Sequence, residues 1–333
     1  MGCGAKDKKD AGLGSIMGAL IGDALGVVLE FHEGPPTLQM VDNALTMPGG
    51  GYWGVAPGQV SDDGELTICQ LQGLGEAGSY DLEKVAGWYA RWIRSNPFDV
   101  GTTTKNSMGG IDRSDWKKIS QTEGYAPAMT KAAAVYCLDS KANGSLMRAA
   151  PLGVMGHRYT ADEIGAFAKA DSSLSHPNEL CGGAVAIYAM AVAGLVRGEK
   201  SEKVFGDVSS WAEKNTNDEV REWLSFAERN QKPRYYPQAG FIKIAFVEAF
   251  RHFVLGTEYL PAIRETLLGG GDTDTNSCII GGLLGARTGF SNLPTAMKEK
   301  VLDCDTKNGT RPRPDFLHPR KVLDSLPSLF KNS

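Results

Sequence analysis

Apolar side chains recur every three to four positions along most of the chain, which is the period of an α-helix. Within 81–95 they fall at positions 82, 85, 88, 89 and 92. Residues 160–174 begin with Thr160 and have Glu163 three positions later, a capping-box pattern. Residues 181–198 are apolar on nearly every side, so we place this helix at the centre of the core. Long alternating strand patterns are absent, and we predict an all-α fold of ten or more helices.

Breaks rich in proline and glycine divide these helices without separating domains. They lie at 34–37, 48–58, 232–240 and 311–319, and none is long or distinctive enough to be a domain linker. We therefore predict a flexible N-terminal tail over 1–12, followed by one compact single-domain bundle over 13–333. Functional side chains are expected on the loops between helices, in a cleft.

Residues 13–29 approach the length of a membrane span, with Asp23 as the single charge. Glycine recurs at every fourth position of this segment, at 14, 18, 22 and 26. In a helix these glycines form one stripe, which lets another backbone approach closely. An ionisable group at the middle disfavours a lipid environment. The pattern predicts a buried helix packed closely against a neighbour.

Charge and cysteine usage narrow the possible partners. The net charge of -4 and the absence of a long basic run argue against a nucleic-acid partner. Six cysteines are dispersed without a C-x-x-C pair, which is typical of a reducing compartment. We expect a cytoplasmic protein that is not bound to a membrane, and a monomer.

Two short acidic clusters carry the candidate chemistry. Ser61, Asp62 and Asp63 are consecutive, and Asp272, Asp274 and Thr275 follow three glycines. Their hard oxygen atoms suit Mg²⁺, Mn²⁺ or Ca²⁺ better than zinc, and four carboxylates could neutralise two divalent cations. Both clusters also precede apolar helical sequence, where Ser and Asp are good N-caps. The residues alone leave metal binding and helix capping open, and the two can coexist.

Five stretches, in this order, resemble the ADP-ribosylglycohydrolase family, which includes the dinitrogenase-reductase-activating glycohydrolase. The stretches are spread over most of the chain, and their combination is far more specific than any one of them. They are GDALGVVLEF (22–31), PGQVSDDGEL (57–66), DVGTTTKNSM (99–108), NGSLMRAAPLG (143–153) and GGGDTDTNSCIIGGLLGA (269–286).

The resemblance implies an all-α fold with a two-metal cleft that holds two divalent cations, Mg²⁺ or Mn²⁺. It assigns the metal ligands to both acidic clusters: Ser61, Asp62, Asp63, Asp272, Asp274 and Thr275. Glu30 would lie at the cleft mouth and Asp99 beside the metals, as candidate catalytic groups. The remaining implied residues bind substrate: Gly101, Thr103, Asn143, Gly144, Ser145, Met147, His176 and Phe241.

The implied activity is metal-dependent hydrolysis that removes ADP-ribose from a modified protein side chain. Water would attack the anomeric ribose carbon through an oxocarbenium-like transition state. The DVGTTT stretch resembles the arginine-specific branch, so the expected partner is an arginine-ADP-ribosylated protein, or ADP-ribose itself. Hydrolysis of a small ADP-ribosyl metabolite is a further alternative.

Two residues depart from the family pattern. Gly64 stands where a threonine usually follows the aspartate pair, which we expect to loosen the loop. Phe241 replaces a tyrosine that often stacks on adenine, and it keeps the apolar face but loses the hydroxyl. These departures leave open a catalytically weak or inactive member with a structural role, like the J1 lens crystallins, that retains metal binding.

Overall fold

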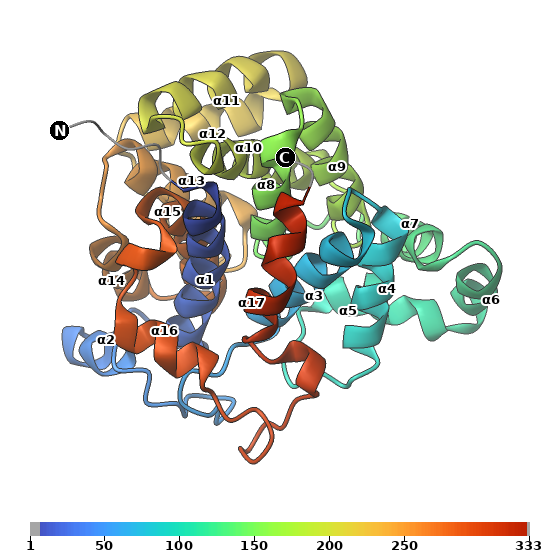
Figure 1. Cartoon of the computed structure of the whole chain (residues 1–333), viewed down its shortest axis with the longest axis horizontal. Helices are drawn as coiled ribbons and strands as arrows, with labels where there is room; N and C mark the ends of the chain where they lie inside the picture. Colours follow the sequence, from blue (N-terminus) through green and yellow to red (C-terminus); the bar gives the residue numbers. More distant parts are fainter. Residues whose placement is uncertain (1–6, 332–333) are drawn as a thin grey trace.

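The predicted helical periodicity is realised throughout the computed structural model, which describes residues 7–331 (Figure 1). These residues contain no β-strand, only the isolated bridges Gly50–Val55 and Ala142–Phe241, and the all-α prediction is confirmed. The helices are α1 (Lys8–Gly26), α2 (Leu38–Ala44), α3 (Asp62–Ala77), α4 (Leu82–Ile93), α5 (Thr102–Ser107), α6 (Ser114–Thr122), α7 (Tyr125–Tyr136), α8 (Ala150–Met155), α9 (Ala161–Ser173), α10 (Glu179–Val196), α11 (Ser201–Asn215), α12 (Asp218–Glu228), α13 (Ile242–Val254), α14 (Tyr259–Gly269), α15 (Thr273–Thr288), α16 (Thr295–Leu302) and α17 (Lys321–Ser325).

Helix α1 begins at Lys8, five residues before the expected start at position 13. The side chain of Asp7 accepts a hydrogen bond from the backbone N–H of Lys9, which fixes the first turn. Gly12 is buried, and a β-carbon there would lie 2.8 Å from the ring of Phe330. Residues 8–12 of the expected tail are therefore helical, and residues 1–6 lie outside the described part of the chain.

The glycine stripe of α1 packs directly on α15, as its four-residue spacing predicts. A β-carbon on Gly18 would lie 2.3 Å from the carbonyl oxygen of Gly281, and one on Gly22 would lie 2.0 Å from that of Ser277. The hydroxyl of Ser15 donates to the carbonyl of Gly282 at 2.9 Å. The two helices run side by side at the centre of the fold (Figure 1), so their ends have fixed relative positions.

Helix α10 is the central helix expected from its all-round apolar sequence. It is long and apolar enough to cross a membrane by composition, but 94% of its apolar window is buried inside the fold. Its Tyr188 hydroxyl donates to the carbonyl of Ile279 on α15 at 2.9 Å. The apolar surface of α10 is thus covered by neighbouring helices.

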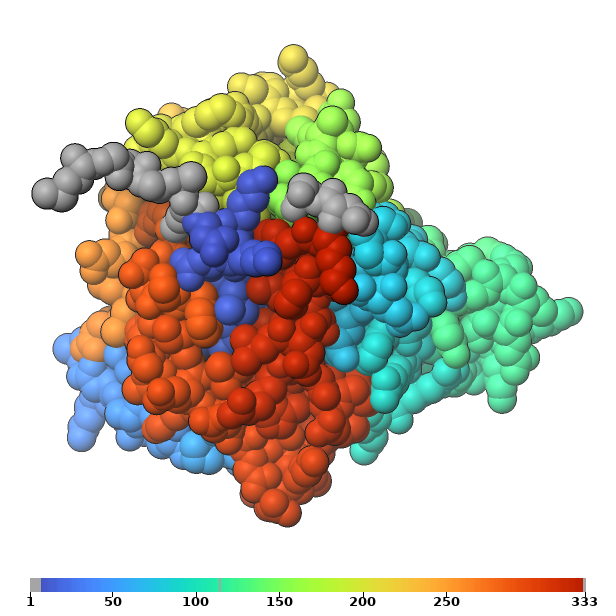
Figure 2. Space-filling view, in the orientation of Figure 1, coloured from blue at the N-terminus to red at the C-terminus, as the bar shows by residue number. Residues whose placement is uncertain are grey.

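The remaining helices surround this centre. Helices α11, α12 and α13 lie on one side and α4 to α7 on another, with α6 projecting outward (Figures 1 and 2). The segment that contains α16 and α17 lies against α1. The C-terminal end of α1 meets the N-terminal ends of α3 and α15, and that junction holds the acidic clusters.

Candidate metal centre and substrate pocket

Three helix ends bring the two acidic clusters together. The hydroxyl of Thr273, the first residue of α15, donates to the carbonyl of Gly26 at 2.8 Å. The backbone N–H of Ser61, which precedes α3, donates to both carboxylate oxygens of Asp23 at 3.0 Å. Clusters more than 200 positions apart in sequence therefore meet at the end of α1.

Neither cluster caps its helix through the N-cap side chain. Ser61 and Asp272 occupy the N-cap positions of α3 and α15, but neither side chain makes a capping hydrogen bond. The hydroxyl of Ser61 lies 2.8 Å from Asp23 Oδ1 and 3.0 Å from Asp63 Oδ2. Asp272 Oδ2 accepts from Asn143 Nδ2 at 2.8 Å. Asp274 Oδ1 also accepts from the backbone N–H of Thr275 in the first turn of α15 at 2.9 Å, so this side chain serves both the helix N-terminus and the cluster.

The carboxylates form two triads that share one member. In one triad, oxygens of Asp23, Asp63 and Asp274 all lie within 4.8 Å of one another. In the other, oxygens of Glu30, Asp99 and Asp274 do so. A shared carboxylate between two oxygen groups is the arrangement expected of two neighbouring cation sites.

Burial and mutual repulsion disfavour the ionised form of these carboxylates unless a positive charge lies beside them. The pKa is raised to about 7 for Asp23, to about 8 for Glu30 and to about 9 for Asp99. Burial is the largest cause of each of these shifts, and repulsion from neighbouring carboxylates adds to it. The pKa values of Asp62, Asp63 and Asp274 are raised well above their usual range for the same two reasons.

The described residues supply no positive side chain to these carboxylates. No ion pair of residues 7–331 involves Asp23, Glu30, Asp62, Asp63, Asp99, Asp272 or Asp274. Asp63 Oδ1 is buried and has no hydrogen-bond partner among the described residues. An orphaned carboxylate oxygen within an all-oxygen cluster fits hard divalent cations.

Asp23 belongs to this centre although the sequence motifs did not identify it. It is fully buried, and besides Ser61 it accepts a hydrogen bond from the backbone N–H of Gly64 at 2.7 Å. The available signal was a single charge within the apolar segment 13–29, since a buried charge needs a specific partner.

Gly64 does not loosen the loop, contrary to our expectation. It lies in the first turn of α3, where a β-carbon would sit 2.6 Å from Val60 Cβ and 2.7 Å from Asp23 Oδ2. The missing side chain therefore makes room for the Asp23 carboxylate against the helix backbone, and the contact is tight.

A pocket of about 380 Å³ opens above the carboxylates. Most of the predicted site residues line it: Glu30, Asp62, Asp99, Gly101, Thr103, Asn143, Gly144, Met147, His176, Asp272, Asp274 and Thr275. Ser61 and Asp63 are buried beside the pocket and do not line it. The pocket walls thus come from loops between helices that are distant in sequence.

The wall opposite the carboxylates presents a neutral histidine. Burial, with a contribution from Arg148, lowers the pKa of His176 to about 3. Ser175 Oγ accepts from Arg148 at 2.9 Å and lies 2.8 Å from His176 Nδ1. This contact engages the Nδ1 atom of the neutral ring and leaves Nε2 as its other polar atom. A β-carbon on Gly144 would lie 3.1 Å from Nε2, so this wall needs a glycine.

Two predicted substrate-binding residues lie outside this pocket. Ser145 is fully buried and accepts a hydrogen bond from Ser172 at 3.0 Å. Phe241 lines a separate pocket of about 620 Å³, and its ring packs edge-on against Trp223 at 5.7 Å between centroids. The bridge between Ala142 and Phe241 joins the walls of the two pockets, so Phe241 is a neighbour of the carboxylate pocket without entering it.

Several pocket residues were missed by the motif analysis. Phe31 and Trp53 line the mouth, and Trp53 Nε1 donates to Glu30 Oε2 at 2.8 Å. Trp53 lies in GGGYWG (49–54), a glycine-rich stretch between prolines, and Phe31 directly follows Glu30. The remaining missed lining residues are Val100, Thr102, Thr104 and Ala142.

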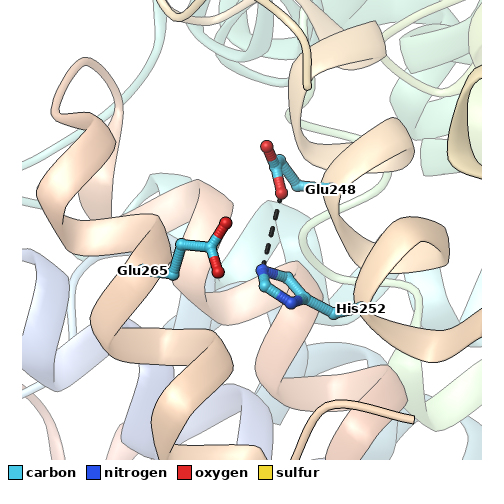
Figure 3. Close-up of side chains that lie close together, drawn as sticks. All are labelled: Glu248, His252 and Glu265. Carbon is cyan, nitrogen blue, oxygen red and sulfur yellow. Dashed lines mark ion pairs between the residues drawn. The ribbon is translucent and has the colours of Figure 1, made fainter. Parts of the chain in front are cut away.

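A second acidic group, between α13 and α14, is an ion-pair network. Glu248, His252 and Glu265 lie close together (Figure 3), with Glu248 Oε2 3.5 Å from His252 Nε2. Arg251 Nη2 lies 2.6 Å from both Glu248 Oε2 and Glu265 Oε1, and 3.0 Å from His252 Nε2. Because the guanidinium already occupies the centre of this group, it is not a candidate cation site.

Comparison with known proteins agrees with this geometry. The family model described as ADP-ribosylglycohydrolase matches residues 5–327. A protein of Acanthamoeba polyphaga mimivirus whose name places it among the ADP-ribosyl glycohydrolases is 31% identical over 311 residues, covering 87% of this chain and 90% of its own length. The ADP-ribosyl-[dinitrogen reductase] glycohydrolase of Rhodospirillum rubrum is 25% identical over 315 residues, covering 95% and 98%.

Two further matches extend the comparison. The ADP-ribosylarginine hydrolase Tri1 of Serratia proteamaculans is 25% identical over 302 residues, covering 88% of this chain and 75% of its own. A solved structure named ADP-ribosylglycohydrolase-related protein complex superposes with a TM-score of 0.70 at 20% identity, covering 98% of both chains. The last match shows a common fold.

Proposed function

We propose, from the premise that the chain belongs to the ADP-ribosylglycohydrolase family and is a hydrolase, that it removes ADP-ribose from arginine side chains with the help of two divalent cations. The observation that carries the proposal is the meeting of the two acidic clusters: oxygens of Asp63 and Asp274 lie within 4.8 Å of each other, and oxygens of Asp274 lie equally close to those of Glu30 and Asp99.

The residues that would hold Mg²⁺ or Mn²⁺ are those of the two clusters: Ser61, Asp62, Asp63, Asp272, Asp274 and Thr275. Asp23 would support them from beneath, since it accepts hydrogen bonds from Ser61 and Gly64. When bound, the cations would supply Lewis-acid stabilisation of charge on the ribose hydroxyls and on a nearby water.

Glu30 and Asp99 are the proposed catalytic carboxylates. Both line the pocket beside Asp274, and the indole N–H of Trp53 holds one oxygen of Glu30 in place. One of the two carboxylates takes a proton from the water that attacks the ribose C1″ atom. A C–O bond forms, the bond from C1″ to the arginine nitrogen breaks, and that nitrogen receives a proton as it leaves.

The opposite wall is proposed to bind the ADP-ribose. Neutral His176 lines the pocket, and its Nε2 atom can form a hydrogen bond with a ribose hydroxyl, either as donor or as acceptor. Gly144 and Gly101 also line the pocket, and their lack of a side chain suits a close approach of the diphosphate. Thr103 adds a hydroxyl, although Ser140 Oγ already lies 2.8 Å from it.

The name of one relative supports the arginine linkage, and the name of another supports a protein substrate. The Serratia relative is an ADP-ribosylarginine hydrolase, and the Rhodospirillum relative acts on ADP-ribosylated dinitrogen reductase. The proposed partner is accordingly an arginine-ADP-ribosylated protein. The relatives' names favour a hydrolase over the alternative of an inactive structural protein.

The test measures release of ADP-ribose from an arginine-ADP-ribosylated protein with Mg²⁺ or Mn²⁺, and again with chelator. The double variant Asp272→Asn/Asp274→Asn should lose release. The matched control is Asp303→Asn/Asp305→Asn, which has the same two-residue spacing on an exposed loop. Release that survives chelation would contradict the metal-dependent mechanism. Absence of release from arginine, with serine-linked substrate cleaved, would contradict the linkage.

A further inference from the structure

Four aromatic side chains form a continuous cluster beside the pocket, which we name the aromatic rim: Phe31, Tyr52, Trp53 and Phe98. Phe31 and Trp53 line the pocket, and Tyr52 and Phe98 pack against them. Ring centroids are 4.9 Å apart for Phe31–Tyr52 and for Tyr52–Trp53, and 5.8 Å for Trp53–Phe98, all in edge-to-face arrangements. Phe31 and Tyr52 are 59% and 68% exposed.

Phe31 has a backbone conformation that is unfavourable for a bulky residue. Its φ of 59° lies in the left-handed region, which bulky residues rarely adopt. Such a conformation costs on the order of 1–3 kcal/mol and clusters at functional sites. Since the ring of Phe31 is also more than half exposed, neither burial nor backbone preference accounts for a phenylalanine at this position.

The inner member of the rim connects it to the proposed catalytic carboxylate. Trp53 lines the pocket, and its indole N–H donates to Glu30 Oε2 at 2.8 Å. Arg311 lies over the Trp53 ring at 5.7 Å and donates from Nε to the Trp53 carbonyl at 2.6 Å. Trp53 is half-buried, and Phe31 and Tyr52, the outer rings, are the most exposed of the cluster.

The loop that carries Tyr52 is fixed against α1. Gly51 has a φ of 69°, and a β-carbon there would lie 2.9 Å from the carbonyl oxygen of Val27 and from the Cα atom of Val28. Gly50 and Val55 exchange backbone hydrogen bonds at 2.8 and 3.0 Å, which close the turn. The outer rings consequently project from a supported turn, and a ligand could bind them without ordering the backbone first.

We propose that Phe31 and Tyr52 bind the acceptor side of the substrate, namely the arginine side chain and the polypeptide that carries it. This inference rests on the proposed function. A guanidinium stacks on aromatic faces and is attracted by their negative π surfaces. Glu30 and Asp99 line the same part of the pocket and complement its charge. The ADP-ribose portion binds the wall formed by Gly144 and His176, and the departing arginine leaves past the rim.

The test compares Phe31→Gly and the double variant Phe31→Gly/Tyr52→Ser with wild type. Glycine tolerates the left-handed φ, so these variants should fold normally. For an arginine-ADP-ribosylated peptide, kcat/KM should fall about tenfold in the double variant, mainly through KM. The inhibition constant of free ADP-ribose should stay within about twofold. The control Tyr136→Ser removes a 45% exposed aromatic ring of α7 that does not line the pocket.

Each outcome separates the rim from the hydrolase activity. An unchanged KM for the peptide overturns the inference, and an equal loss of ADP-ribose affinity assigns the rim to adenine or ribose instead. If wild type releases no ADP-ribose, the peptide conjugate persists and its affinity can be measured directly by calorimetry. If wild type binds the conjugate more tightly than ADP-ribose and the double variant loses this difference, the role of the rim in acceptor binding is supported although the proposed function fails. Equal binding of both would overturn the rim.

Discussion

Replacing Gly64 by alanine tests how closely the carboxylate centre is built around α3. In an ordinary helix this change is stabilising by at most about 1 kcal/mol, because glycine is the more flexible residue in the unfolded chain. Here the new β-carbon would lie 2.6 Å from Val60 Cβ, 2.7 Å from Asp23 Oδ2 and 2.9 Å from Leu20 Cδ2. All three neighbours are buried, so the sign of the effect should reverse.

The expected magnitude follows from two costs. Overpacking of a buried site costs about 1–3 kcal/mol. Displacing the Asp23 carboxylate also weakens its hydrogen bonds from Ser61 and Gly64, and hydrogen bonds to charged groups contribute about 1.5–3 kcal/mol each. After subtraction of the helix-propensity gain, Gly64→Ala should lower the free energy of unfolding by about 2–4 kcal/mol.

The assay is urea unfolding in chelator, with a second series in Mg²⁺ or Mn²⁺ to measure cation-induced stabilisation. Gly206→Ala is the matched control, since Gly206 lies within α11, is exposed, and has no heavy atom within 4 Å of the position that a β-carbon would occupy. That variant should gain about 0.5–1 kcal/mol. If Gly64→Ala is as stable as wild type and binds cations equally well, the confinement of Asp23 by this glycine is wrong.

Three further predictions follow from the same geometry. Asp274→Asn should abolish cation-induced stabilisation, a loss of about 2.7 kcal/mol when the cation concentration is 100 times Kd. The same variant should be more thermally stable than wild type in chelator, because it removes a buried carboxylate whose pKa is raised by burial and like charge. The control variant Asp303→Asn should show neither effect. Folded-state pKa values of about 8 for Glu30 and about 9 for Asp99 exceed their ordinary values, so their contribution to stability is present at low pH and lost as pH rises through 8 to 9. Melting in chelator should therefore occur at lower temperature at pH 9 than at pH 6, while the increment added by Mg²⁺ grows over that range. Arg148→Met should cost about 3–5 kcal/mol, because the buried Asp171 carboxylate, 3.1 Å from the Arg148 Nε atom, loses its partner; a calorimetric scan that shows less than about 1 kcal/mol would contradict this.

The sequence predicted those features that depend on local periodicity or on residue chemistry. The glycine spacing in 13–29 predicted a close helix contact, because a four-residue repeat places all four glycines on one face. The all-oxygen composition of the two acidic clusters was compatible with cation binding and with helix capping, and the structure brings members of both clusters together. Thr160 and Glu163 form the capping box that their spacing indicated.

Other features depend on where distant segments meet. The partners of Asp23 on α3 are 38 and 41 positions away, and no local pattern indicates them. Gly64 was expected to be loose because its neighbours in space, Leu20 and Val60 among them, were unknown. Phe241 lines the adjoining pocket because the bridge to Ala142 places its ring on the other side of that wall. The position of Phe241 in the sequence could not show which of the two pockets its ring lines.

The contact between α1 and α15 also has a consequence for synthesis of the chain. The two helices come from opposite ends of the sequence, and the hydrogen bond from Ser15 to Gly282 joins residues 267 positions apart. During translation α1 emerges first, with its apolar and glycine-rich face uncovered, and α15 follows only after most of the protein has been made. Such long-range contacts form slowly, and exposed apolar surface favours aggregation meanwhile. The nascent chain should therefore depend on chaperones until α15 has left the ribosome, and fragments that end before residue 273 should neither fold fully nor assemble the carboxylate centre.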